Sequence, residues 1–193
     1  MTTNSKVEFK QKARERLKHL AKLELARRDY GSYFMLANEY RYAMMKHTRY
    51  LCDQMNRVIN KGNQFYLISM PPQTGKSLTL TKTFPSYWLM NNPDKEAIIA
   101  TYSDELANKF GRANRAKIAA YASELYGVEL SHQKATSTTL TLNNHSGSML
   151  FTTISGQLTG NGADLLIIDD PTKGFQDAQS KLKQERLWDS WSG

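Results

Sequence analysis

The chain has 193 residues, of which 40% are apolar, and this suits one domain with a single sizeable core. Lysine and arginine outnumber aspartate and glutamate by 26 to 18, so the formal charge is +8. That charge favours a polyanionic partner such as nucleic acid, although an ordinary basic surface explains it equally well. The sequence has no run of about 18 apolar residues and no apolar signal-peptide core, so we expect a cytoplasmic protein without a membrane partner.

Cysteine and histidine offer little chemistry here. Cys52 is the only cysteine, which excludes an internal disulfide and a cysteine-based metal cluster. We expect Cys52 to act as a small buried apolar residue. The four histidines lie far apart and show no metal-ligand spacing, so the sequence predicts no metal site made by histidine or cysteine.

The N-terminal part reads as helical, and we assign residues 1–62 to an N-terminal helical region. Residues 6–30 carry nine basic and four acidic side chains, which predicts a basic amphipathic helix ending at Gly31 or Ser32. A helix packed through its apolar stripe is favoured over one that contacts DNA or a partner. Residues 33–60 predict a second helix. The stripe of the first helix consists of Leu17, Leu20, Ala21 and Leu25.

From residue 63 onwards the pattern becomes α/β. Residues 64–70 form a short aromatic and β-branched run that predicts a buried strand. A loop rich in proline and glycine follows, and a helix is expected to start at Lys76 and Ser77. Pro85 is expected to kink or divide that helix.

The next elements continue the alternation. Residues 96–102 predict a strand, and Ser103 marks the start of a helix that stops at Gly127. Residues 138–155 alternate apolar and polar side chains on both sides of the turn at 143–147, which is typical of a hairpin.

The last predicted strand is a continuous apolar run, residues 165–168, which we expect to be buried on both faces. Helices between strands indicate a mostly parallel sheet covered by helices on both sides. The tail is helical in pattern, and we expect Trp188 and Trp191 to pack against another surface.

The segment "SMPPQTGKS" has the end of a phosphate-binding loop. Such a loop points backbone N–H groups and a helix N-terminus at phosphate oxygens. Gly75 allows close approach, Lys76 would reach the β and γ phosphates, and the Ser77 hydroxyl would bind Mg²⁺. Met70 replaces the usual first glycine, so the loop must turn in another way. The predicted nucleotide-binding residues are Pro72, Gln73, Thr74, Gly75, Lys76 and Ser77.

An acidic pair follows the apolar run 165–168. Asp169 is predicted to bind Mg²⁺ through a water, and Asp170 to orient or polarise the attacking water. The alternative is that both are polar residues at a strand end, one of them capping the loop that begins at Pro171. The order of loop and acidic pair favours hydrolysis of a nucleoside triphosphate, with ATP and Mg²⁺ as cofactors.

Phosphoryl transfer also needs a positive charge near the γ-phosphate. Arg112 and Arg115 lie three residues apart on one predicted helix face, after a strand whose C-terminal end should face the nucleotide. Either could act as a catalytic arginine finger or sensor, in its own subunit or in a neighbour. An equally good interpretation is that both are solvated helix residues.

Four segments together resemble the terminase large subunits of tailed phages, the ATPases that pump viral DNA into preformed capsids. They are "SMPPQTGKS", "ATYSDELANKFGRANRAKI", "SGQLTGNGADLLIIDDPTK" and the tail around Trp188 and Trp191, and they follow the order of that family. The resemblance covers about residues 35–193. Its second and third segments are much more specific than the loop.

The resemblance implies an α/β P-loop NTPase of the additional-strand, catalytic-acid type. Residues 63–193 would be an incomplete ATPase core that stops before the coupling segment and the nuclease domain. The implied partners are double-stranded viral DNA, a terminase small subunit and the portal of the procapsid. The implied assembly is a homo-oligomeric ring of five subunits, in the cytoplasm of an infected or lysogenic bacterial host cell.

Three residues depart from the family pattern. Gln73 and Asn161 stand where relatives often carry arginine, so the source of an arginine finger stays open. Asp170 stands where many P-loop motors use glutamate, and its shorter side chain must lie closer to the water.

Two other functions remain open. One is a helicase-like P-loop DNA translocase, and the other is a non-hydrolysing nucleotide-binding remnant or regulatory partner. For the adenine ring, the aromatic side chains before the loop offer stacking surfaces. These are Tyr40, Tyr42 and Tyr50.

Overall fold

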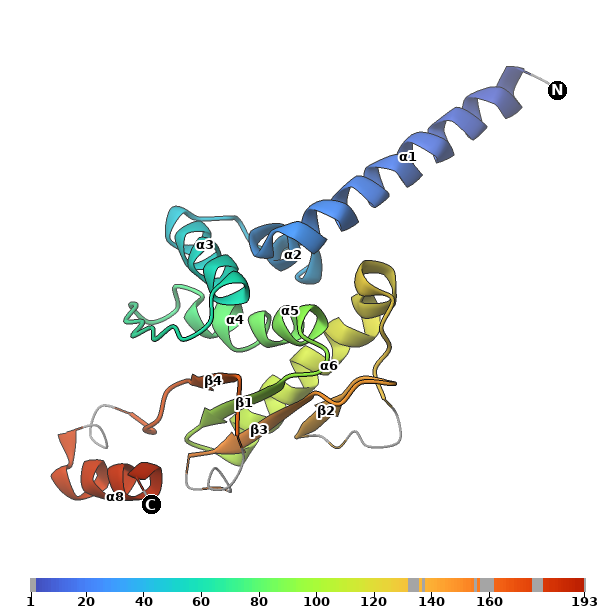
Figure 1. The fold of residues 1–193 in the computed structure, drawn as a ribbon. Coiled ribbons are helices and arrows are strands. Elements are labelled where there is room, and N and C mark those ends of the chain that lie inside the picture. Colours follow the sequence, from blue (N-terminus) through green and yellow to red (C-terminus); the bar gives the residue numbers. More distant parts are fainter. Residues whose placement is uncertain are drawn as a thin grey trace. The chain divides into compact units, whose positions relative to one another are not determined.

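The structure, a computed structural model, divides into two compact units, residues 1–64 and 65–193 (Figure 1). The domain boundary predicted after residue 62 stays a prediction, because compactness alone does not establish an independently folding domain. The residues described are 3–131, 136, 138–154, 156, 162–174 and 179–192.

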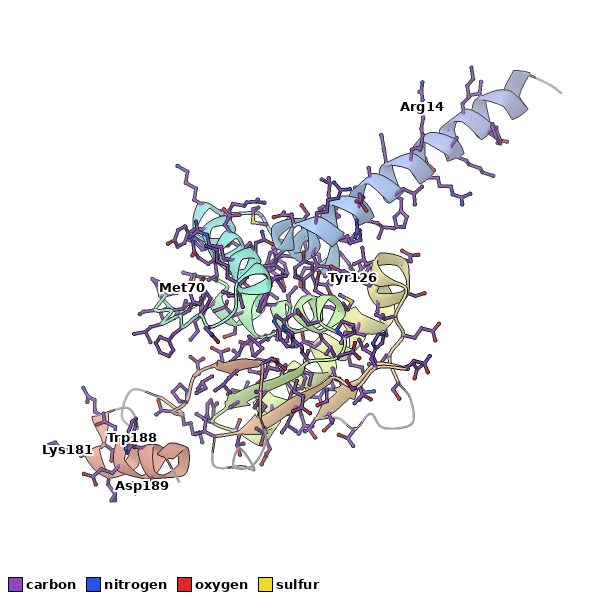
Figure 2. All side chains as sticks on the ribbon, in the orientation of Figure 1. Arg14, Met70, Tyr126, Lys181, Trp188 and Asp189 are labelled. Atoms are coloured by element: carbon purple, nitrogen blue, oxygen red, sulfur yellow. The ribbon has the colours of Figure 1, made fainter. Side chains whose placement is uncertain are left out.

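The first unit begins with a long helix, α1 (Thr3–Arg28), which confirms the predicted basic helix. Its side chains from residue 7 to residue 22 are all exposed, and Figure 2 shows them standing out along the helix around Arg14. The apolar stripe is therefore not packed as predicted, since Leu17, Leu20 and Leu25 are exposed. Burial is confined to the last turns of α1, which pack against the next helix.

That next helix is α2 (Tyr30–Ala37), and Asp29 forms its N-cap. The break therefore falls at Asp29, and Gly31 lies inside α2 instead of ending α1. The expected single helix over residues 33–60 is also wrong, because residues 38–45 separate α2 from α3 (Lys46–Asn60). Glu39 and Tyr40 both have φ of 55°, in the left-handed region that interrupts a helix.

Asp29 joins α2 to α3 through a network of hydrogen bonds. Its carboxylate accepts bonds from Ser32 N and Oγ and from Asn56 Nδ2, each 2.8 Å long. Asn56 Oδ1 in turn accepts a 2.7 Å bond from the Tyr30 N–H. Burial opposes ionisation of Asp29, but these hydrogen bonds and the nearby charge of Arg49 hold its pKa below its ordinary value. The Asp29 carboxylate thus caps the start of α2 and also holds α2 against α3.

Cys52 lies on α3 and is buried, as the sequence predicted. Burial, with the added effect of the negative charges of Asp29 and Asp53, raises the pKa of the Cys52 thiol to about 12. A thiol of that pKa stays protonated and acts as a small apolar group.

The second unit contains a four-stranded sheet with the order β2-β3-β1-β4. Strand β1 (Glu96–Thr101) pairs parallel with both β3 (Ser148–Thr153) and β4 (Leu165–Ile168). Strand β2 (Thr139–Thr141) pairs antiparallel with β3, with Leu140 opposite Met149. The predicted α/β class, the mostly parallel sheet and the hairpin are confirmed in this mixed sheet.

In this unit, two helices precede β1 in the sequence, and a third lies between β1 and β2. The helix predicted from Lys76 is divided at residues 81–83 into α4 (Lys76–Leu80) and α5 (Phe84–Asn91). Pro85 lies in the first turn of α5, where its missing N–H costs nothing. Helix α6 (Asp104–Tyr126) packs on β1, β2 and β3, and α5 packs against α6 and the sheet.

Both ends of α6 follow their predicted signals. Ser103 is the N-cap, and its hydroxyl accepts a bond from the Leu106 N–H. Gly127 ends the helix with φ of 67°, a conformation that glycine adopts without strain.

Two strand predictions need correction. Residues 64–70 do not form a strand, and Phe65 and Leu67 are 92% and 91% exposed. Strand β4 is not buried on both faces, because Leu166 and Ile168 are 42% and 41% exposed. The reason is pairing: among the described residues, β4 pairs only with β1, and segment 64–70 pairs with no strand.

The tail forms helix α8 (Lys181–Ser192), as its pattern predicted. Trp188 is largely exposed on this helix (Figure 2), so its expected packing is not found within the described chain. The side chain of Trp191 lies outside the described residues. In the part of the chain that the structure covers, no helix combines the length and apolarity needed to cross a membrane.

Candidate active site

Lys76 lies between the two aspartates that follow β4. Its Nζ is 3.1 Å from Oδ1 of Asp169 and 2.6 Å from Oδ1 of Asp170. Burial alone would lower the pKa of Lys76, but the hydrogen bond to Asp170 and the charge of Asp169 raise it above its ordinary value. The site therefore holds a protonated lysine beside two carboxylates.

Two elements place these groups. Lys76 is the first residue of α4, directly after Gly75, whose φ of 89° lets the chain turn into the helix. On the other side, the Asp169 N–H donates a 3.0 Å bond to the carbonyl of Ala100 and so extends the pairing of β4 with β1. The carboxyl end of a parallel strand and a helix N-terminus thus meet, which is the usual geometry of a ligand site in α/β folds.

The two carboxylates differ in environment. The side chain of Asp169 is 4% exposed, whereas that of Asp170 is 56% exposed. Asp170 has φ of 48°, an uncommon conformation for a residue with a side chain. Asp169 is thereby held within the protein, and Asp170 is presented to solvent, where it can contact a water molecule.

Sequence reasoning missed one member of this site, Thr81. Its Oγ donates a 2.7 Å bond to Oδ2 of Asp169, and both side chains are buried. Thr81 ends α4 four residues after Ser77, and its N–H donates to the Ser77 carbonyl. Residues four apart share a helix face, so the spacing associates Thr81 with Ser77, the residue predicted to bind Mg²⁺. This spacing is the signal that could have identified Thr81.

The loop before α4 turns without the usual first glycine. Gln73 takes φ of 62°, and the Thr74 hydroxyl donates a 2.6 Å bond to the Pro71 carbonyl. Left-handed residues at positions 73 and 75 therefore make the turn that a glycine at Met70 would have eased. Pro72 and Gln73 are exposed, so the loop faces solvent.

The two arginines of α6, Arg112 and Arg115, are the candidates for the positive charge near the γ-phosphate. Arg115 donates a hydrogen bond to the Thr136 carbonyl, and Arg112 is exposed. Within the described residues neither forms a hydrogen bond or ion pair with Lys76, Asp169 or Asp170. Asn161 lies outside the described residues. A finger role for either arginine stays a prediction.

Oxygen ligands suited to Mg²⁺ are present, since Mg²⁺ prefers carboxylate, hydroxyl, phosphate and water oxygens. Asp169 supplies a buried carboxylate, and Ser77, next to Lys76 in α4, supplies a hydroxyl. The described residues contain no group of three or more histidine, cysteine, aspartate or glutamate side chains that could hold a metal by themselves. These residues therefore suit a metal ion that also binds oxygen atoms of its substrate.

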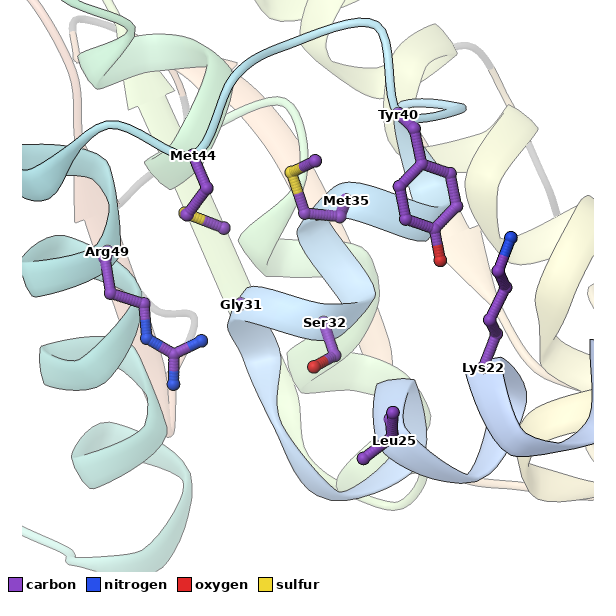
Figure 3. Close-up of a pocket in the computed structure, with 8 residues that line it drawn as sticks. All are labelled: Lys22, Leu25, Gly31, Ser32, Met35, Tyr40, Met44 and Arg49. Carbon is purple, nitrogen blue, oxygen red and sulfur yellow. The ribbon is translucent and has the colours of Figure 1, made fainter. Parts of the chain in front are cut away.

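The first unit has a pocket of its own. It has a volume of about 250 Å³ and includes one of the tyrosines considered for adenine (Figure 3). Lys22 Nζ lies 4.6 Å from the centre of the Tyr40 ring, so this ring face is occupied by a cation. Tyr42 and Tyr50 are exposed, and their adenine role stays a prediction. The residues that line the pocket are Lys22, Leu25, Gly31, Ser32, Met35, Tyr40, Met44 and Arg49.

The fold and the site define an α/β protein in which a lysine at a helix start contacts two carboxylates beyond a parallel strand. Comparison with protein families matches residues 67–191 to "Terminase large subunit, T4likevirus-type, N-terminal". Because this match covers more than half of the 193 residues, the chain belongs to that terminase family. A search among curated proteins found no match. The family supports a role in packaging phage DNA.

Proposed function

We propose that this chain hydrolyses ATP as part of the terminase motor that moves viral DNA into the procapsid. The observation that carries the proposal is the contact of Lys76 with both Asp169 and Asp170, more than 90 residues away in the sequence. A lysine of a loop ending in Gly-Lys-Ser beside an acidic pair is the arrangement that P-loop NTPases use. We accordingly propose a P-loop NTPase fold for residues 63–193.

The proposed role of each residue follows from its position in the site. Lys76 has three N–H donors, two of which face carboxylates, and its charge is suited to the β and γ phosphates. The backbone of residues 72–77 binds phosphate oxygens at the start of α4. Asp169 and Ser77 would hold Mg²⁺, which when bound would supply positive charge to the phosphates. Asp170, exposed beside Lys76, orients and polarises the attacking water.

The wider role follows from the family. Double-stranded viral DNA is the proposed cargo, and the terminase small subunit and the procapsid portal are the proposed partners. We also propose that the chain acts in a ring of identical subunits, in the cytoplasm of the bacterial host. The family match and the basic net charge of +8 support the DNA part of this proposal.

Phosphate release from ATP by the purified chain tests the enzymatic step. Lys76→Ala and Asp170→Asn should each lower turnover at least about 100-fold, because each removes charge stabilisation or positioning of the attacking water. The matched controls are Lys181→Ala and Asp189→Asn, which make the same kinds of change at exposed residues of α8 (Figure 2). Turnover that survives either site substitution contradicts the assignment.

Two measurements separate the alternatives. Titration with a fluorescent ATP analogue shows whether the chain binds nucleotide, and binding without phosphate release would establish a non-hydrolysing remnant. A strand-separation assay on partial duplex DNA distinguishes a helicase-like translocase, because packaging moves intact duplex. Lys76→Ala should abolish the ATP signal in the titration, since it removes the cation that contacts the phosphates.

A further inference from the structure

Two buried hydroxyl groups have no hydrogen-bond partner among the described residues, Thr101 Oγ1 and Thr141 Oγ1. Thr101 is the last residue of β1 and is fully buried. Thr141 ends β2, which lies at the opposite edge of the sheet from β4. Buried hydroxyls are nearly always paired, because burial removes the water that would otherwise bind them. A functional explanation for the unpartnered Thr101 is therefore worth seeking.

The register of the sheet places Thr101 beside Asp169. Strands β1 and β4 pair in parallel with Ala100 opposite Ile168, and the Asp169 N–H continues this pairing with a 3.0 Å bond to the Ala100 carbonyl. Thr101 and Asp169 are the next residues on the two strands. Adjacent strands lie about 4.8 Å apart, and residues opposite each other point to the same face of the sheet. The side chains of Thr101 and Asp169 are thus neighbours on one face.

The Asp169 carboxylate already has two donors, and both come from α4. Oδ1 lies 3.1 Å from Lys76 Nζ, and Oδ2 accepts a 2.7 Å bond from the Thr81 hydroxyl. The neighbouring hydroxyl of Thr101 forms a bond with neither oxygen. Lys76 therefore stands where Thr101 could otherwise donate.

The proposed function requires Lys76 to leave this position. In binding the β and γ phosphates, its ammonium group turns away from Asp169. A buried carboxylate oxygen that loses its donor is destabilised, because water cannot replace the lost bond. Thr101 has an uncommitted donor and lies next to that carboxylate on the same face of the sheet.

We propose that Thr101 is a positioning residue that alternates with Lys76 as hydrogen-bond donor to Asp169. In the arrangement of the structure, Lys76 contacts Oδ1 and the Thr101 hydroxyl has no partner. When Lys76 turns to the phosphates, Thr101 donates to the released oxygen. This inference rests on the proposed function for the ligand that draws Lys76 away, but not for the contact of Thr101 with Asp169.

The alternation keeps one carboxylate in place in both arrangements. Thr81 holds Oδ2 throughout, and Oδ1 is held by Lys76 or by Thr101. A donor behind a metal-binding carboxylate fixes its orientation, and loss of such a donor commonly weakens metal binding 10–100-fold. Thr101 would thus keep Asp169 oriented as a ligand for Mg²⁺ after Lys76 has moved.

Thermal unfolding of the full chain without nucleotide tests the contact itself. Thr101→Val replaces the hydroxyl by a methyl group of similar size, and the thermal midpoint should stay equal or rise, since an unpartnered buried hydroxyl is removed. Lys76→Met removes the competing ammonium group, so in this background Thr101 should already donate to Asp169. There Thr101→Val should lower the midpoint by about 4 °C. Equal effects of Thr101→Val in the two backgrounds overturn the proposal.

Two further variants control this cycle. Thr101→Ser keeps the hydroxyl and should change the midpoint by the same amount in both backgrounds. Thr141→Val makes the matched change at the other unpartnered buried hydroxyl, across the sheet from β4. It should also have the same effect in both backgrounds. If Lys76→Met alters the effects of Thr141→Val and Thr101→Val alike, the coupling is not specific to Asp169 and the proposal is wrong.

Titration with the fluorescent ATP analogue at increasing Mg²⁺ tests the consequence for the metal. Thr101→Val should raise the Mg²⁺ concentration for half-maximal binding about tenfold, whereas Thr101→Ser and Thr141→Val should leave it near the native value. An unchanged Mg²⁺ requirement in Thr101→Val overturns the positioning role. A native chain that binds no analogue contradicts the proposed function, while the unfolding cycle, which needs no nucleotide, still decides whether Thr101 replaces Lys76 at Asp169.

Discussion

The Thr81 hydroxyl donates a 2.7 Å hydrogen bond to Asp169 across 88 residues of sequence. The same carboxylate contacts Lys76 through its other oxygen, at 3.1 Å. One buried aspartate thus receives bonds from the first residue of α4 and from the residue that ends it. The short helix and the end of β4 are held together at both ends of α4, which explains how a five-residue helix can present a defined site.

Replacing Thr81 by valine tests this arrangement, because valine has nearly the same shape but no hydroxyl. Thr81→Val should lower the free energy of unfolding by about 1–3 kcal/mol, since a buried carboxylate oxygen loses its donor. Urea unfolding followed by circular dichroism measures the change. Thr81→Ser keeps the donor and serves as the control. If valine and serine have the same effect, the hydrogen bond does not hold Asp169.

Asn114 connects α4, α5 and α6 at their junction. Its side chain accepts a bond from the Ser86 N–H and donates to the carbonyls of Thr81 and Phe110, all at 2.9 Å. Asn114→Ala should cost about 2–4 kcal/mol, because it leaves buried backbone groups without partners. The comparison variant is Asn108→Ala, which removes one bond to the Asp104 carbonyl near the helix surface. Equal losses for the two variants would be inconsistent with the proposed junction.

The lowered pKa of Asp29 predicts that the protein loses stability in acid. Hydrogen bonds hold its pKa in the fold below that of the unfolded chain, which is about 3.9. The stabilisation is therefore complete above the unfolded pKa and is lost as the pH falls through the lower folded pKa. Denaturant unfolding between about pH 6 and pH 2 should show this loss in the native chain and a smaller one in Asp29→Asn.

A measurement at high salt distinguishes the contribution of Asp29 to the pH dependence from that of Glu24, a second carboxylate with a lowered pKa. Hydrogen bonds from Arg27 and Arg28 lower the pKa of Glu24 to about 2, but these groups lie on the surface of α1. Salt at about 1 M screens surface charges strongly and the Asp29 network much less. If the pH dependence disappears entirely at high salt, it comes from the surface and not from Asp29.

Gly147, between β2 and β3 of the hairpin, is closely packed against neighbouring backbone. A Cβ atom at this position would lie 2.4 Å from the Pro93 carbonyl oxygen and 2.5 Å from that of Lys95, both of them backbone atoms. Gly147→Ala should therefore destabilise the chain by about 1–3 kcal/mol through overpacking. Gly174→Ala is the matched control, since nothing lies within 4 Å of its Cβ position. A thermal midpoint unchanged by Gly147→Ala would show that the strands separate easily there.

Local signals in the sequence predicted many elements correctly. Ser103 and Gly127 mark the ends of α6 because capping depends on residues next to each other in the chain. The hairpin of β2 and β3 follows from alternation around a short turn, which is also local. Predictions failed where an element depends on a distant segment of the chain. Segment 64–70 has the composition of a strand, but a strand forms only beside another strand, and no described strand pairs with this segment.

The candidate site shows the same division. The sequence by itself determined which residues carry the chemistry, because Lys76, Ser77 and the acidic pair stand in recognisable short motifs. Only the tertiary structure decided that Lys76 contacts both aspartates and that Thr81 holds the buried one. The physical reason is range: a motif records neighbours along the chain, whereas hydrogen bonds and charges act between groups that folding brings together.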